Sequence, residues 1–216
     1  MPQTPVRLAP IRHAAFTLLE LLVVIAIIAI VLGFLIPSLG TGQGRSAEAA
    51  ARQLTADLDG ARLTAIAERT RTRILFPTSN ANFAAGTSSN AWPTDIAYRG
   101  YLVVSEKRTD TRWTQRGKWN RFPTGIALDL TASALPTPTP MPIDVGGSGS
   151  TSYTFTGPYI EFLSNGSSNL DPAATPTPSA VVADGFVDSG GTFVQKNTNL
   201  RYTITVDPLT GAVSLK

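Results

Sequence analysis

The sequence predicts an α+β protein in which a long N-terminal helix packs on a C-terminal antiparallel β-sheet or β-sandwich domain. Residues 16–37 are almost wholly apolar, and residues 38–73 repeat small apolar side chains at helical spacing. From residue 74 onward apolar and polar residues alternate with a period of two, which is typical of strands. The chain therefore divides into a basic leader (1–15), an apolar helix (16–37), an amphipathic continuation of that helix (38–73) and a β-rich globular domain (74–216).

The apolar segment is long enough to cross a membrane. It reads FTLLELLVVIAIIAIVLGFLIP, and residues 16–36 would form a helix about 31 Å long at ~1.5 Å per residue. The hydrocarbon core of a bilayer is roughly 30 Å thick. A helix on the surface of a globular protein has a polar face, and this segment has none after Glu20. We expect a helix that lies in a membrane for at least part of the protein's life.

Glu20 is the one charged residue of the apolar segment. A charged side chain at the centre of a membrane helix costs roughly 2.5–3.5 kcal/mol, and less near the interface. One interpretation is an interfacial carboxylate that reaches water and has no role. The other is a carboxylate that pairs with a positive group. If the chain were cut before Phe16, the new α-amino group would lie one helical turn from Glu20, and the amino terminus of a neighbouring copy could pair with it instead.

The motif Phe16-Thr17-Leu18-Leu19-Glu20, followed by the apolar run, resembles the signal of type IV pilin-like proteins. The resemblance implies that a prepilin peptidase cuts between Ala15 and Phe16 and N-methylates Phe16. The family usually has Gly before the cut, where this chain has Ala15. It also implies that Glu20 pairs with the N-terminal amine of an adjacent subunit in a helical filament. Gly33 and Pro37 fall where pilin helices commonly bend.

The resemblance further implies partners and a location. The partners would be the prepilin peptidase, other pilins or pseudopilins, and an assembly platform in the bacterial inner membrane. Arg7 and Arg12 precede the apolar segment, and positive charge there is retained in the cytoplasm. We expect a single-pass protein with a periplasmic or extracytoplasmic globular domain, which later joins a pseudopilus or pilus.

Two motifs near the end of the chain resemble the GspH/FimT family of minor pseudopilins and minor pilins. The first consists of Ile160, Phe162 and Gly166, and the second of Val206, Gly211 and Val213. The resemblance implies a minor subunit of a type II secretion pseudopilus or a type IV pilus.

The composition argues against an enzyme. The 216 residues include no cysteine, and the one histidine, His13, lies in the leader. A chain that starts at Phe16 therefore lacks the residues of Ser-His-Asp triads, Cys-His pairs and the usual zinc centres. We expect no catalytic residues, no cofactor and no metal. With 18 basic and 15 acidic residues the net charge is +3, which is weak support for a polyanion partner.

The segment after the apolar helix predicts an amphipathic helix with a narrow apolar stripe. Gly40, Gly42 and Gly44 predict a bent or loosened stretch before it. The stripe is built largely from alanine, which suits close packing against a sheet. Its members are Ala47, Ala50, Ala51, Leu54, Leu58, Ala61 and Ala65.

The rest of the chain predicts strands that are joined by turns and loops. Residues 164–167 (SNGS) and 208–211 (PLTG) have the composition of hairpin turns. Residues 78–94 predict a long loop. The strands are expected at 73–76, 96–108, 113–119, 125–130, 152–156, 159–168, 180–188, 191–195 and 200–216.

Two Thr/Pro-rich segments, 135–142 and 172–178, predict surface loops, because proline at alternate positions prevents sheet pairing. The alternative for each is a glycosylated or partner-binding loop.

A basic segment with interleaved aromatic residues raises the alternative of a DNA-binding minor pilin. Cations and stacking rings are what a polyanion groove uses. The same pattern arises in a hairpin whose Trp rings face the core and whose cations face water, and we favour that interpretation. A third class, a signal-anchored membrane protein with a β domain, fits less of the sequence. The candidate polyanion residues are Arg112, Trp113, Arg116, Lys118, Trp119 and Arg121.

Overall fold

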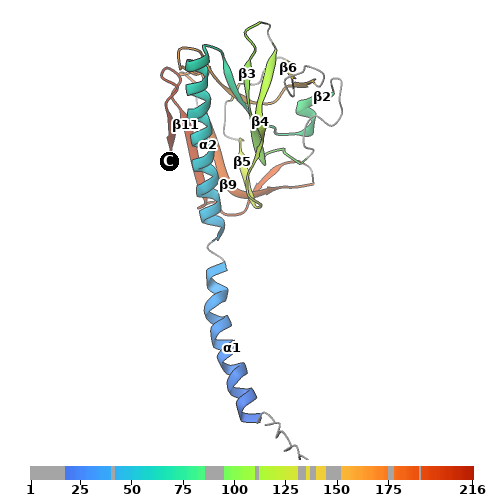
Figure 1. The fold of residues 1–216 in the computed structure, drawn as a ribbon, viewed down its shortest axis with the longest axis vertical. Helices are drawn as coiled ribbons and strands as arrows, with labels where there is room; N and C mark the ends of the chain where they lie inside the picture. The colour runs from blue at the N-terminus through green and yellow to red at the C-terminus, as the bar shows by residue number, and fades with distance from the viewer. Residues whose placement is uncertain are drawn as a thin grey trace, which may run out of the picture. The chain divides into compact units, whose positions relative to one another are not determined.

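The computed structural model describes residues 18–39, 42–85, 95–109, 112–130, 135–136, 140–144, 152–174, 178–189 and 191–216 (Figure 1). The chain forms two compact units, residues 1–42 and 43–216. The first contains helix α1, and the second contains helix α2 and the twelve strands that the described residues form. The fold class is α+β, as the sequence predicts.

Helix α1 spans Leu18–Leu39. It continues through Gly33 and beyond Pro37, so the helix does not end at the residues where a bend was expected. Pro37 has no N–H, so the carbonyl of Gly33 lacks its donor within the helix. None of the helices in the described part of the chain is both long enough and apolar enough to cross a membrane. The membrane-spanning segment therefore stays a prediction from the sequence.

Helix α2 spans Gly42–Glu68, so it includes Gly42 and Gly44, two of the three glycines expected in a loosened stretch before it. The third, Gly40, lies outside the described residues. The predicted stripe is confirmed, because each of its seven residues is at most 2% exposed. Alanine side chains let a helix approach a sheet closely, and α2 lies along the domain beside β9 and β11 (Figure 1). On the outer face Arg52 pairs with Glu48 at 2.8 Å. The spacing of the small residues in this stripe therefore determines which face of α2 packs on the domain.

The strands form two sheets. The seven-stranded sheet has the order β2-β7-β6-β4-β3-β1-β8, and the second sheet has the order β10-β9-β11-β12, with β5 pairing β9. The strands are β1 (Thr72–Leu75), β2 (Phe83–Ala85), β3 (Gly100–Glu106), β4 (Trp113–Arg121), β5 (Ile126–Asp129), β6 (Met141–Asp144), β7 (Ser152–Phe155), β8 (Tyr159–Phe162), β9 (Ser179–Val187), β10 (Phe193–Gln195), β11 (Arg201–Val206) and β12 (Val213–Leu215).

Both faces of the larger sheet are covered. Successive residues of β1 point to opposite faces, so Ile74 joins the core beneath α2 and Leu75 joins a second core. The core beneath α2 also takes residues from the second sheet, such as Val182 and Ile204. The second core is rich in aromatic rings, and Phe83 lies 5.6 Å from Tyr153 between ring centroids.

Three expectations about the strands were wrong. The pairing of β4 with β6 is parallel, so the sheet is not wholly antiparallel. Strand β2 lies within the segment 78–94, which was expected to be a loop. Strand β6 includes Pro142, inside the Pro-rich segment 135–142. There β4 pairs only with Ile143 and Asp144, so Pro142 lies beyond the end of that ladder, where a residue without N–H is tolerated.

Both predicted hairpin turns are confirmed. In the first, the N–H of Gly166 donates to the carbonyl of Leu163 at 2.8 Å, and in the second the N–H of Gly211 donates to that of Asp207 at 2.8 Å. Gly166 and Gly211 have φ of 86° and 67°, a region that side chains with Cβ rarely adopt.

Candidate assembly site on the N-terminal helix

The first part of α1 exposes large apolar side chains on every side. The exposed fraction falls from 84% at Leu18 to 49% at Ile28 and is at least 45% for each large apolar residue between them. Exposed apolar surface costs about 25 cal/mol per Å², so a helix that is apolar all round requires an apolar environment. Within its own unit, this helix therefore forms a surface that needs to be covered by lipid or protein.

Glu20 lies in the first turn of α1, between Leu19 and Leu21. It is exposed, as are the apolar residues on either side of it. The partial positive charge at a helix N-terminus stabilises a carboxylate in this turn. A carboxylate near the end of an apolar helix can bind an amino group. The attraction between the two charged groups is stronger in an apolar environment than in water.

The processing residues Ala15 and Phe16 lie outside the described residues, and the cut between them stays a prediction. No group of three or more His, Cys, Asp or Glu residues that could hold a metal is present in the described ranges. The chemistry available to this site is therefore binding through one carboxylate and a large apolar surface.

Residues 11–36 match a family model described as the prokaryotic N-terminal methylation motif. The match covers both the expected cut and Glu20, and it supports a type IV pilin-like protein that a prepilin peptidase processes. It also supports assembly with other pilins. No curated protein and no solved structure matches the chain.

The cations of the candidate polyanion patch lie on or beside β4 and mostly pair with carboxylates. Arg112 donates to Asp144, with 2.9 Å between Nε and Oδ2. Arg116 donates to the hydroxyl of Ser105 at 2.7 Å and also pairs with Glu68. Arg121 pairs with Asp95. Such pairs weaken the positive potential on which phosphate binding depends.

The aromatic residues of the same patch are turned inward. Trp113 is 3% exposed, and the guanidinium of Arg73 lies 4.0 Å from the centroid of its ring. Trp119 packs edge-on against Phe83, with 5.6 Å between centroids. Lys118 is exposed on β4 between them in the sequence. The buried ring of Trp113 therefore offers no open face for stacking with a base.

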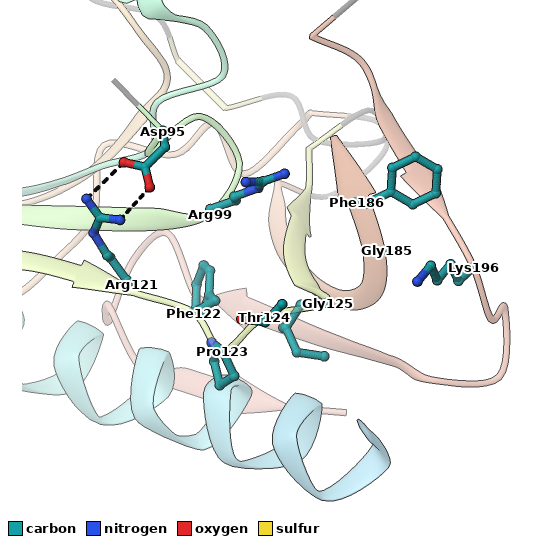
Figure 2. A pocket seen from close by; sticks show the side chains of 11 residues that line it. Asp95, Arg99, Arg121, Phe122, Pro123, Thr124, Gly125, Gly185, Phe186 and Lys196 are labelled. Carbon is teal, nitrogen blue, oxygen red and sulfur yellow. Dashed lines mark hydrogen bonds and ion pairs between the residues drawn. The ribbon is translucent and has the colours of Figure 1, made fainter. Parts of the chain in front are cut away.

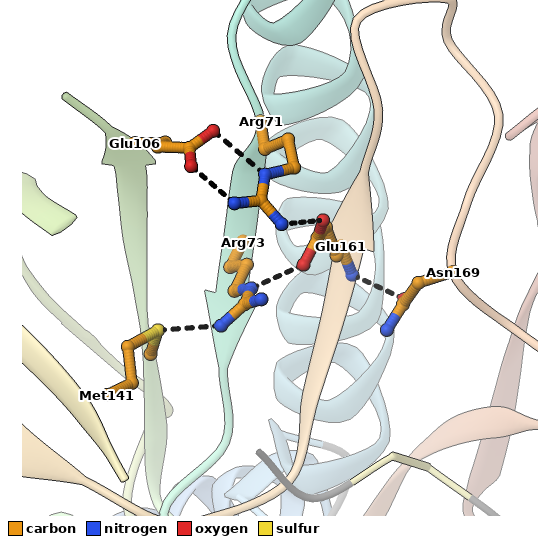
Figure 3. A network of polar contacts seen from close by, with 6 residues as sticks. All are labelled: Arg71, Arg73, Glu106, Met141, Glu161 and Asn169. Carbon is orange, nitrogen blue, oxygen red and sulfur yellow. Dashed lines mark hydrogen bonds and ion pairs between the residues drawn. The ribbon is translucent and has the colours of Figure 1, made fainter. Parts of the chain in front are cut away.

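A network of charged side chains that the sequence did not predict joins three neighbouring strands (Figure 3). Arg71 and Arg73 reach Glu161 on β8, and Arg71 also donates to Glu106 on β3, with 2.8 Å between Nε and Oε2. Glu161 is 4% exposed, so its charge requires these partners. Its backbone N–H donates to Asn169 at 2.8 Å. Arginines at alternate positions, Arg71 and Arg73, indicate that this segment carries charge on one face. Their carboxylate partners could not be identified, because they lie far away in the sequence.

The hydrogen bond between Arg71 and Glu106 shifts the pKa values of both residues. The hydrogen bond from Arg71 holds the pKa of Glu106 below its usual value, and the same bond raises the pKa of Arg71. Both residues therefore stay charged at neutral pH. The network fixes β1 between β3 and β8, and we assign it a structural role.

A second polar contact joins α2 to the larger sheet. The hydroxyl of Tyr101, on β3, donates to Asp57 on α2. The side-chain amide of Asn120 donates to the same carboxylate at 3.3 Å. Burial raises the pKa of Tyr101, and its bond to Asp57 raises it further. The contact stabilises the packing of α2 on the sheet.

Proposed function

We propose that this chain is a minor pilin-like structural subunit of a type II secretion pseudopilus or a type IV pilus. The observation that carries the proposal is the exposed apolar surface of residues 18–28 of α1, in which Glu20 is the one charged residue, within residues that match the methylation motif. No enzymatic activity is part of this proposal.

The proposed mechanism starts in the bacterial inner membrane. The chain inserts with its leader in the cytoplasm and its globular unit outside. The prepilin peptidase then cuts before Phe16 and methylates the new amino terminus. The subunit is held by its apolar helix until an assembly platform extracts it. Because contacts between helices replace contacts with lipid, extraction is nearly balanced in free energy, and pairing of Glu20 with an amino terminus favours the filament.

The finer assignment to the GspH/FimT family draws support from the contact between its two motifs. Gly166 belongs to the first motif and Gly211 to the second, and the two residues touch. A role in DNA uptake is the alternative, and the pairing of the arginines on β4 gives it little support.

The test replaces Glu20 in the full chain and measures both processing and incorporation. We expect Glu20→Ala and Glu20→Gln to leave expression and cleavage intact and to abolish incorporation into sheared filaments. The matched control is Glu48→Gln, which removes a partly exposed carboxylate on α2 and should leave incorporation unchanged. Normal incorporation of both Glu20 variants would refute the pairing role of this carboxylate.

A further inference from the structure

A cavity of about 310 Å³ opens in unit 43–216 (Figure 2). It lies between the turn that joins β4 to β5 and the pair of strands β9 and β10. Its volume is at the lower end of the range of ligand sites in proteins. The lining residues are Asp95, Arg99, Arg121, Phe122, Pro123, Thr124, Gly125, Ile126, Gly185, Phe186 and Lys196.

Backbone hydrogen bonds fix the walls of this cavity. The N–H of Phe122 donates to the carbonyl of Arg99 at 2.8 Å, and the N–H of Gly185 donates to that of Gly125 at 2.9 Å. The N–H of Lys196 donates to the carbonyl of Asp184 at 2.9 Å. Because the backbone of both cationic residues is held in place, binding of a ligand has to order their side chains but not their backbone.

Two cations point into the cavity from opposite sides. Figure 2 shows the guanidinium of Arg99 and the ammonium of Lys196 directed toward its middle from different walls. The third cation, Arg121, is occupied by Asp95 through two hydrogen bonds of 2.6 and 2.9 Å. Asp95 is the one carboxylate among the lining residues, so the cavity has an excess of positive charge.

Most of the other lining side chains are apolar, and Thr124 is the polar exception. Phe122 and Pro123 come from the turn after β4, Ile126 begins β5, and Phe186 comes from β9. Phe186 is 42% exposed, although aromatic rings of this size are usually buried. Lys196 Nζ lies 5.7 Å from the centroid of the Phe186 ring, which keeps the ammonium beside the apolar wall. The cavity therefore combines a positive centre with an apolar wall.

We propose that this cavity binds an acidic peptide segment of a partner protein. A carboxylate of the segment lies between Arg99 and Lys196, and an adjacent apolar side chain packs against Phe186. Charged donors such as arginine and lysine form strong hydrogen bonds to carboxylates, and covering the exposed part of an aromatic ring is favourable. This inference is independent of how α1 assembles.

The lining favours a peptide over a nucleic acid. Binding along a phosphate backbone uses many cations in a row. The described lining holds only three cations, and one of them, Arg121, already forms an ion pair with Asp95. The remaining arginines of the basic segment, Arg112 and Arg116, pair outside the cavity.

The experiment titrates the full chain in detergent micelles with the blocked peptide acetyl-Ala-Glu-Phe-Asp-Ala-amide. Its matched twin replaces Glu by Gln and Asp by Asn. Binding is followed by ligand-observed NMR, with empty micelles as the blank. We expect the acidic peptide to bind and its twin to bind at least several-fold more weakly. Arg99→Gln and Lys196→Gln should each weaken binding about two- to fivefold, the range that exposed ion pairs supply.

Lys216→Gln is the control variant, because Lys216 is exposed and lies outside the cavity lining. It should bind the acidic peptide as the unchanged chain does. Equal binding of the two peptides, or unchanged binding in both cavity variants, would overturn the proposal. So would tighter binding of inorganic phosphate or of a twelve-nucleotide oligothymidine, since the site would then recognise phosphate.

Discussion

Gly211 touches Gly166: a Cβ atom placed on Gly211 would lie 2.1 Å from the carbonyl oxygen of Gly166. The same oxygen accepts a hydrogen bond from Arg62 Nε, on α2, at 3.1 Å. Two turns that are far apart in the sequence therefore meet at one point on the helix. Each glycine has positive φ, and Gly211 also has no room for a side chain.

Gly211→Ala should lower the free energy of unfolding markedly. The substitution adds backbone strain of about 1–3 kcal/mol and a steric clash that costs about 1–3 kcal/mol. The control is Gly191→Ala, because Gly191 also has positive φ but has open space around it. It should cost only the strain. Urea unfolding of the full chain measures the free energy of unfolding of both variants. An equal decrease in both would show that the contact with Gly166 does not contribute to stability.

Leu58→Ala and Leu63→Ala provide a matched pair on α2. Leu58 is fully buried, and its truncation should cost about 2–5 kcal/mol, because a cavity forms beneath the helix. Leu63 is 62% exposed, and its truncation should change stability by no more than about 0.5 kcal/mol. The midpoint of urea unfolding separates the two. Similar midpoints would show that α2 does not pack on the sheets through its alanine-rich stripe.

The ion pair between Arg71 and Glu106 should make stability depend on pH in acid. The folded-state pKa of Glu106 lies below its usual 4.5 because Arg71 donates a hydrogen bond to it. A group with a lowered folded-state pKa stabilises the protein above its unfolded-state pKa, and that stabilisation is lost as the pH falls through the folded-state pKa. We therefore expect the urea concentration at the unfolding midpoint to decrease as the pH is lowered below about 4.5.

Glu106→Gln should flatten this acid-dependent drop. Arg71→Gln should flatten it to a similar extent, because it removes the other partner, and the double variant should add little to either. An unchanged drop in both single variants would show that other carboxylates cause the acid dependence.

The mature chain should begin at Phe16 and carry one extra methyl group on its amino terminus. Ala15→Leu should block the cut, because the predicted site requires a small residue before it, and Ala15→Gly should leave it intact. Intact-mass spectrometry of protein from a host with an active prepilin peptidase measures all three. Recovery of a chain that still begins at Met1 would contradict the proposed processing.

Helical spacing was the most informative part of the sequence. The stripe from Ala47 to Ala65 gave the buried face of α2 because each turn of a helix repeats the same local geometry. The turns at Gly166 and Gly211 were predicted for a similar reason, since they depend on a few adjacent residues. These features need no knowledge of distant parts of the chain.

Long-range pairing could not be predicted in the same way. The parallel pair of β4 and β6 joins Trp113 to Ile143, and nothing in either segment specifies the direction of pairing. Pro142 concealed a strand, because proline argues against sheet pairing. The pairing of β6 with β4 begins one residue later, at Ile143. The partners of Arg73 and the walls of the cavity around Arg99 come from four or more separate segments, so they follow only from the fold.

The division of the chain at residue 42 has a practical consequence. Each buried apolar residue in the described ranges lies between Ala47 and Val206. A fragment that starts at Gln43 would therefore keep these buried residues and omit the apolar helix α1. Crystallographers could work with such a fragment without detergent, and could attach an affinity tag at its new start.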